Sequence, residues 1–131
     1  ALASGKDPRR MGSAHPNLVP YRAFEASDGW FVIAVGSDNQ WANLCAVLNI
    51  ENKEGWHTNA GRIDEREVIE STLSRIVGDY SRAELEELLT GIPCAPVNTI
   101  TEALNDKQSK ARGLVTEYNG VDVLASPLRF Y

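Results

Sequence analysis

The sequence contains few of the residues that support metal, redox or nucleic-acid chemistry. Its 131 residues include two histidines and two cysteines, whereas a zinc site needs about three or four clustered ligands. Asp and Glu outnumber Lys and Arg by 18 to 13, and no basic run is present that would neutralise phosphates. No apolar run approaches the roughly 20 residues of a membrane-spanning helix. We therefore predict a cytoplasmic chain with no metal site, no permanently bound cofactor, no nucleic-acid partner and no membrane span.

The sequence also has no recognisable motif that pairs a nucleophile with a base. His15 precedes a proline, which favours extended backbone and a structural or surface role, and His57 lies in a polar stretch where exposure is expected. Cys45 and Cys94 are far apart in the chain and near no histidine motif, so free thiols in a reducing compartment are the favoured interpretation, with a disulfide as the alternative. Motifs alone assign no catalytic residue to this chain.

Two strands joined by a tight turn are predicted early in the chain, at residues 21–26 and 30–35. The Asp28-Gly29 pair between them favours a hairpin, because glycine supplies the positive φ of a tight turn. Residues 30–35 (WFVIAV) are almost continuously apolar. This pattern predicts a strand covered on both faces, with Trp30, Phe31, Ile33 and Val35 in the core.

Helical spacing of apolar residues follows, with Trp41, Leu44, Cys45 and Leu48 on one face. Further helices are predicted over residues 64–77, from Ser81 and from Thr99, the last two because Ser or Thr is followed three residues later by Glu. A second hairpin is predicted around Asn119-Gly120, with strands at 114–118 and 121–125. The order predicts an α+β fold with a small, mainly antiparallel sheet and several helices. We expect the acidic side chains in the first turns of these helices to be solvated, among them Glu65, Glu67 and Glu70.

One short segment is a candidate binding site. It joins the end of the apolar strand to the start of a helix, and it consists of Gly36, Ser37, Asp38, Asn39 and Gln40. Such a connection presents free backbone amides and short polar side chains to a ligand. Ser37 or Asp38 is the predicted N-cap of the helix. The alternative is an ordinary connection whose side chains only cap the helix.

Five segments, in order along the chain, resemble the class III (CaiB/BaiF-type) acyl-CoA transferases. They are residues 9–21 (RRMGSAHPNLVPY), 26–36 (ASDGWFVIAVG) followed by Asn39-Gln40, 91–98 (GIPCAPVN), 111–115 (ARGLV) and 126–130 (SPLRF). The resemblance covers nearly the whole chain and matches the small domain of that family. It implies that residues 14–131 form this small domain and that residues 1–13, which are polar and contain Gly, Ser and Pro, are a linker from a large domain outside the chain.

The resemblance also implies an activity for the longer protein. Enzymes of the family move CoA from an acyl-CoA to a carboxylic acid through an aspartate nucleophile, which stores the acyl group and then CoA in covalent intermediates. That aspartate and most CoA contacts belong to the large domain, so no residue of this chain is assigned as catalytic, and the chain alone is expected to be inactive. The CoA thioester is a substrate, and the longer protein is expected to be a homodimer.

In the family, the small domain covers the active site, and its strand-to-helix loop corresponds to residues 36–40. Formyl-CoA transferases have a glycine-rich loop here, whereas this chain has Ser37-Asp38-Asn39, which argues against oxalate/formate exchange and leaves the acceptor acid open. The related α-acyl-CoA racemases carry a catalytic glutamate in a comparable loop. Because Asp38 is one methylene shorter and residues 15–21 look more transferase-like, a transferase is favoured over a racemase. A non-catalytic binding module derived from the domain is the other alternative.

Overall fold

The computed structural model describes residues 10–126 and 128, and the chain divides into two compact units, Ala1–Val97 and Asn98–Tyr131. Most of the predicted linker and most of the segment 126–130 therefore lie outside the described residues. Sequence patterns did not reveal the division after Val97, and the domain start at residue 14 stays a prediction. The described residues form helices and small antiparallel sheets, which confirms the predicted α+β class. No helix among them has the length and apolar character to cross a membrane.

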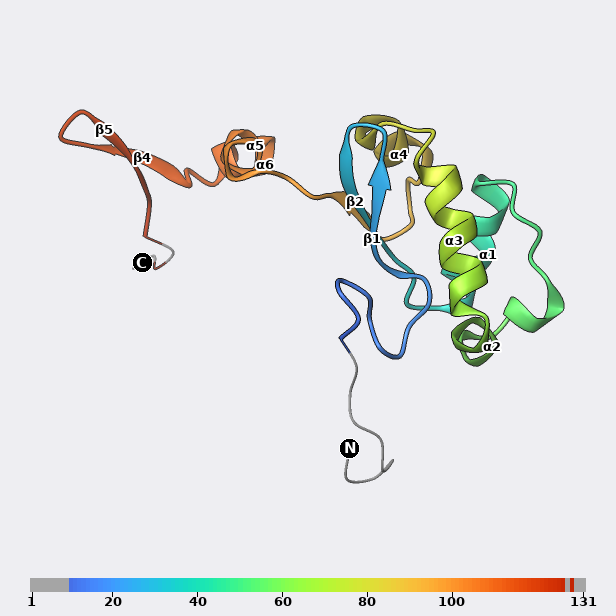
Figure 1. Ribbon diagram of the computed structural model, residues 1–131. Coiled ribbons are helices and arrows are strands. Elements are labelled where there is room, and N and C mark those ends of the chain that lie inside the picture. Colours follow the sequence, from blue (N-terminus) through green and yellow to red (C-terminus); the bar gives the residue numbers. More distant parts are fainter. Residues whose placement is uncertain (1–9, 127, 129–131) are drawn as a thin grey trace, which may run out of the picture. The chain divides into compact units, whose positions relative to one another are not determined.

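The first unit combines a three-stranded sheet with five helical segments (Figure 1). Its elements are β1 (Tyr21–Ala26), β2 (Gly29–Ala34), α1 (Asp38–Val47), the 3₁₀ helix η1 (Glu54–Trp56), α2 (Asn59–Asp64), α3 (Arg66–Val77), α4 (Arg82–Leu88) and β3 (Cys94–Pro96). Strand β2 lies in the centre and pairs antiparallel with both neighbours, so that Phe31 is opposite Phe24 on one side and Pro96 on the other.

The first hairpin forms as predicted. Among Ser27, Asp28 and Gly29, only Gly29 has a positive φ, at 146°. A Cβ atom at Gly29 would also lie 3.2 Å from the side chain of Arg82. The Asp28 carboxylate accepts a 2.8 Å hydrogen bond from the backbone N–H of Arg82, so the turn is tied to the start of α4.

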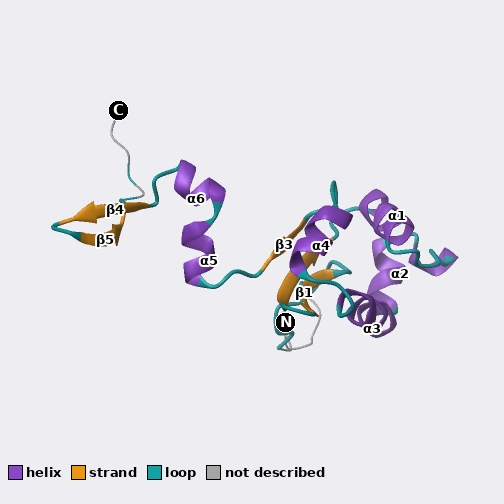
Figure 2. Cartoon of the chain, turned by 90° about the horizontal axis from the view of Figure 1, so that it is seen from above, coloured by secondary structure: helices purple, strands orange, loops and turns teal. Residues whose placement is uncertain are grey.

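Strand β2 is covered on one face only, and the predicted two-sided burial is wrong. Phe31, Ile33 and Val35 are fully buried, whereas Trp30 is 48% exposed. Helices α1 and α3 lie on the same side of the strands (Figure 2), and alternate side chains of a strand point to opposite faces. Trp30 therefore faces away from the helices, and the prediction that it belongs to the core is also wrong.

The core lies between the sheet and its helices. Trp41 of α1 packs edge-to-face on Trp56 of η1, with ring centroids 6.0 Å apart. The predicted apolar face of α1 is buried as expected, and α3 and α4 add further buried side chains: Trp41, Leu44, Cys45, Leu48, Ile69, Leu73, Val77, Leu85 and Leu89. Ile76 is only half-buried against this cluster.

The helix predicted over residues 64–77 is confirmed as α3, and the structure adds a short helix before it, α2, that the sequence patterns did not indicate. Thr58 caps α2 through a hydrogen bond from the N–H of Gly61 to its hydroxyl, and Glu65 ends α2 and precedes α3. A Cβ atom at Gly61 would overlap the carbonyl oxygen of Gly55. Only glycine therefore allows α2 to approach the η1 segment this closely, and apolar periodicity alone gives no sign of this contact.

Glu70 corrects the expectation that the acidic side chains of these helices are solvated. It is 8% exposed and accepts hydrogen bonds from Arg22 at 2.8 Å and Arg66 at 3.1 Å. A buried carboxylate is stable when charged donors compensate its lost hydration. Arg66 also donates to the carbonyl oxygens of His15 and Pro16. Glu70 thus helps to hold the segment before β1 on α3.

The second unit contains α5 (Ile100–Asn105), α6 (Lys107–Ala111), β4 (Val115–Tyr118) and β5 (Val121–Leu124). Thr99 and Glu102 form the predicted capping box of α5. Asn119 and Gly120 both have positive φ, as the predicted two-residue hairpin requires. The described residues from Asn98 onward are all exposed or half-buried.

The one-sided burial of β2 gives a test of this packing. Phe31→Ala should lower the free energy of unfolding by about 3–5 kcal/mol, because it removes a fully buried ring, whereas Trp30→Ala on the open face should lower it by about 1 kcal/mol. Urea denaturation of both variants measures the difference. Equal losses would contradict the assignment of the two faces.

Candidate functional site

The structure places the five candidate residues, 36–40, at the connection between strand β2 and helix α1. Gly36 and Ser37 link β2 to α1, whereas Asp38, Asn39 and Gln40 form the first turn of α1. Four of the five are exposed, and Gln40 is half-buried. The five residues are called the acyl-loop turn below. It lies at one end of the buried strand, so its backbone is anchored by the core at Val35 and Trp41.

Ser37 is the N-cap of α1, which decides between the two candidates from the sequence. Its hydroxyl oxygen accepts a hydrogen bond from the N–H of Gln40 at 3.3 Å. In return, Oε1 of Gln40 accepts from the N–H groups of Ser37 at 3.1 Å and Gly36 at 2.8 Å. This is a reciprocal capping box, and it fixes the Gln40 side chain along the turn.

The capping box leaves three donor groups of the turn without a hydrogen-bond partner among the described residues. They are the backbone N–H groups of Asp38 and Asn39 and the side-chain NH₂ of Gln40, whose oxygen is held by the cap. Because Oε1 is fixed, the NH₂ group has a defined direction. The turn can therefore donate hydrogen bonds to an oxygen atom of a ligand. It also lies at the N-terminus of α1, where the partial positive charge of the helix dipole favours negative charge.

Asp38 has a partner that the sequence did not indicate. Its Oδ1 atom accepts a 2.9 Å hydrogen bond from Nη2 of Arg62, which is 1% exposed, while the Asp38 side chain is 55% exposed. Arg62 lies on α2, 24 residues farther along the chain. It was missed because a single arginine in a short helix matches no motif, and its burial follows only from the packing of α2.

The remaining reactive residues are not arranged for catalysis. His15 stacks on Tyr21, with ring centroids 5.2 Å apart, and His57 is exposed. Both cysteines are free. Burial raises the pKa of the Cys45 thiol to about 11, although the charge of Arg62 partly opposes the rise, and burial also raises the pKa of Cys94. Neither thiol is therefore an activated nucleophile.

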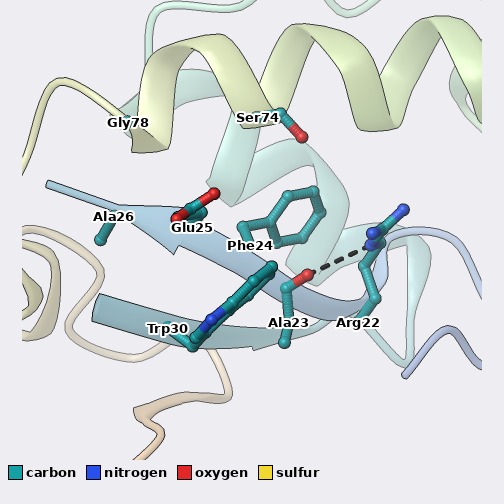
Figure 3. A pocket seen from close by; sticks show the side chains of 8 residues that line it. All are labelled: Arg22, Ala23, Phe24, Glu25, Ala26, Trp30, Ser74 and Gly78. Atoms are coloured by element: carbon teal, nitrogen blue, oxygen red, sulfur yellow. Dashed lines mark hydrogen bonds between the residues drawn. The ribbon is translucent and has the colours of Figure 1, made fainter. Parts of the chain in front are cut away.

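A cavity of about 440 Å³ lies between β1 and α3, away from the acyl-loop turn (Figure 3). It is lined by Arg22, Ala23, Phe24, Glu25, Ala26, Trp30, Ser74 and Gly78. The Arg22 guanidinium is turned toward the backbone, where it donates to the carbonyl oxygen of Ala23 at 3.2 Å. No histidine or cysteine lines the cavity, and no cluster of metal-binding side chains is present among the described residues.

Comparisons of the sequence and of the structure with known proteins both relate the chain to family III CoA-transferases. The family model of CoA-transferase family III matches residues 1–130. A succinate–glutarate CoA-transferase from Agrobacterium fabrum is 32% identical over 96% of this chain and 33% of its own length. A succinyl-CoA:mesaconate CoA-transferase from Haloarcula hispanica is 32% identical over 95% of this chain and 34% of its own length.

Solved structures agree with these sequence relatives. A CaiB/BaiF family protein from Brucella suis superposes with a TM-score of 0.87 and 40% identity, covering 98% of this chain and 35% of that protein. A Mycobacterium tuberculosis protein, Rv3272, shares the fold with a TM-score of 0.76 and 18% identity, covering 87% of this chain and 33% of that protein. The chain thus spans about a third of the length of the proteins it matches.

The raised thiol pKa predicts slow alkylation of Cys45. At pH 8 a shift of the pKa from 9 to about 11 lowers the thiolate fraction about 100-fold, and the buried sulfur is also shielded. Iodoacetamide labelling followed by peptide mass spectrometry should modify Cys94 first and Cys45 only after urea is added. Equal labelling of Cys45 with and without urea would contradict its burial.

Proposed function

The chain belongs to CoA-transferase family III, and from this premise we propose that it forms the small domain that covers the acyl site of an acyl-CoA:carboxylate CoA-transferase. The relatives with curated names transfer CoA to or from small carboxylic acids, among them glutarate and mesaconate. The acyl-CoA thioester and the acceptor acid are then the substrates of the longer protein. Dicarboxylic acids are the first acceptors to test.

The chemistry needs groups that this chain does not supply. In the proposed reaction, an aspartate carboxylate outside the chain attacks the thioester carbonyl, the C–S bond breaks, and CoA leaves as a thiolate, so that the acyl group stays on the aspartate as a mixed anhydride. The thiolate then attacks the aspartyl carbonyl and releases the carboxylate product, which leaves CoA on the aspartate. The acceptor acid reverses these steps. Covalent storage divides one exchange into steps with lower barriers.

The acyl-loop turn is the observation that supports a role for this domain in the reaction. Negative charge develops on the carbonyl oxygen each time a carbonyl carbon is attacked, and fixed hydrogen-bond donors stabilise such charge best. The turn offers the NH₂ group of Gln40 and the backbone amides of Asp38 and Asn39, none of which has a partner among the described residues. We assign Gln40 as the side chain nearest the reacting carbonyl and Asp38 as its neighbour.

The longer protein supplies the remaining parts of the proposed enzyme. The aspartate and most of the CoA-binding surface lie in a large domain, and the longer protein is a homodimer. The two free thiols favour a reducing compartment, the cytoplasm. Within the turn, the bond from Asp38 to Arg62 disfavours the racemase alternative, because the Asp38 carboxylate is already occupied as the counter-ion of a buried guanidinium.

The purified 131-residue chain should not transfer CoA, because the nucleophile lies outside it. The measurement is exchange of CoA from succinyl-CoA to a panel of dicarboxylic acids, followed by chromatography of the CoA thioesters. Turnover by the chain alone that disappears when one of its own carboxylates is replaced would contradict the proposal. No turnover by the longer protein with any acid in the panel would favour the binding-module alternative.

In the longer protein, Gln40→Glu separates capping from chemistry. A glutamate oxygen accepts the same two amide hydrogen bonds, so the melting temperature should stay unchanged, but the NH₂ donor is lost. We expect kcat to fall about 100-fold, the usual effect of removing one donor to an oxyanion. Gln40→Ala loses both functions and should also lower stability by about 1 kcal/mol.

The matched control is Ser81→Ala, which removes the equivalent capping box of α4. It should lower the melting temperature as Gln40→Ala does and leave kcat unchanged. A Gln40→Glu variant with wild-type kcat would reduce the role of Gln40 to capping and remove it from the acyl site.

A further inference from the structure

Arg62 connects four segments of the first unit through one buried side chain. Nε donates to the carbonyl oxygen of Val19 at 2.8 Å, Nη1 to that of Trp56 at 2.9 Å, and Nη2 to Oδ1 of Asp38 at 2.9 Å. The guanidinium also lies 5.5 Å from the ring centroid of Trp41. Its partners therefore come from the segment before β1, from η1 and from both the first turn and the core face of α1.

The burial of Arg62 makes these bonds obligatory. Its side chain is 1% exposed, and a guanidinium stays charged at any pH that a folded protein tolerates. A buried charge without a counter-ion is strongly destabilising. Among the described residues, the carboxylate of Asp38 is the one that forms an ion pair with Arg62. Asp38 is thus the counter-ion of a buried cation, although more than half of its side chain is exposed.

Two anchors hold the acyl-loop turn. The oxygen of Gln40 holds the backbone of Gly36 and Ser37, and Arg62 holds the side chain of Asp38 one residue farther on. A turn that is exposed to solvent normally belongs to the low-stability part of a structure. Here one of its side chains, Asp38, forms an ion pair with a cation that is itself buried in the core.

We propose that Arg62 is the positioning residue of the acyl-loop turn: by holding Asp38, it fixes the donor groups of residues 38–40 in the direction needed at the acyl carbonyl. This inference rests on the proposed function of the turn and adds a residue that does not contact the substrate. It also assigns Asp38 a role as an anchor, not as an acid or base. Because Arg62 also binds the carbonyl oxygen of Val19, the same guanidinium anchors both the turn and the segment before β1.

Arg66 provides a matched comparison within the same unit. It also binds one carboxylate, Glu70, and two backbone carbonyl oxygens, those of His15 and Pro16. Its side chain is 16% exposed, and none of its partners belongs to the acyl-loop turn. Replacing Arg66 by lysine therefore removes the same kinds of bond without acting on the turn.

The experiment compares Arg62→Lys, Asp38→Asn and Arg66→Lys in two forms of the protein. In the 131-residue chain, ¹⁵N relaxation measures the order of the backbone amides of Ser37, Asp38 and Asn39. Lysine cannot reach three acceptors at once, so Arg62→Lys should lower their order parameters from about 0.85 to below about 0.6. Arg66→Lys should leave them unchanged. In the longer protein, Arg62→Lys and Asp38→Asn should lower kcat at least tenfold at unchanged KM, and Arg66→Lys should not.

Each result supports or contradicts the proposal. Unchanged order in Arg62→Lys would overturn it, and so would equal kcat values for Arg62→Lys and Arg66→Lys at matched melting temperatures. If Arg62→Lys does not fold, the order parameters of Asp38→Asn decide, because the loss of the charge weakens the bond to Arg62 at nearly unchanged size: unchanged order of residues 37–39 in Asp38→Asn would then overturn the proposal. A wild-type longer protein without transferase activity would contradict the proposed function, whereas a loosened turn in Arg62→Lys would still support the positioning role.

Discussion

The first unit is organised around one constraint, the need to satisfy the buried guanidinium of Arg62. A cation with 1% exposure must find acceptors for its N–H groups and a counter-ion for its charge. Val19, Trp56 and Asp38 meet this need from three different segments, and Trp41 covers the planar face. The close approach of α2 to Gly55, which only a glycine at position 61 permits, brings the guanidinium to these partners. The position of the acyl-loop turn follows from this packing.

In the proposed site, Gln40 serves both structure and chemistry. Its oxygen ends the capping box of α1, and its nitrogen has no partner among the described residues. A capped helix start is rigid, and rigid donors stabilise developing charge without reorganising during the reaction. A glycine-rich sequence at these positions would give a more mobile loop. The Ser37-Asp38-Asn39 sequence instead gives a turn that is held in place before any substrate binds.

Local patterns were sufficient to predict the elements whose causes are local. The hairpin at Asn119-Gly120 and the capping boxes at Ser81 and Thr99 depend on residues within a few positions of each other, and all three formed as predicted. The exposed face of Trp30 and the buried ion pair of Glu70 were not predicted, because each depends on which elements cover it. Residues 36–40 were found as a candidate site, but the bond from Asp38 to Arg62 joins positions that no sequence pattern relates.

In the proposed enzyme, the acyl-loop turn directs its donors at the carbonyl oxygen of a bound thioester. The most direct measurement is a crystal structure of the longer protein with a non-hydrolysable acyl-CoA analogue bound. We expect the NH₂ group of Gln40 to lie within about 3 Å of the analogue's carbonyl oxygen, with Asp38 still bound to Arg62. A carbonyl oxygen that lies beyond hydrogen-bond reach of every donor in residues 38–40 would contradict it.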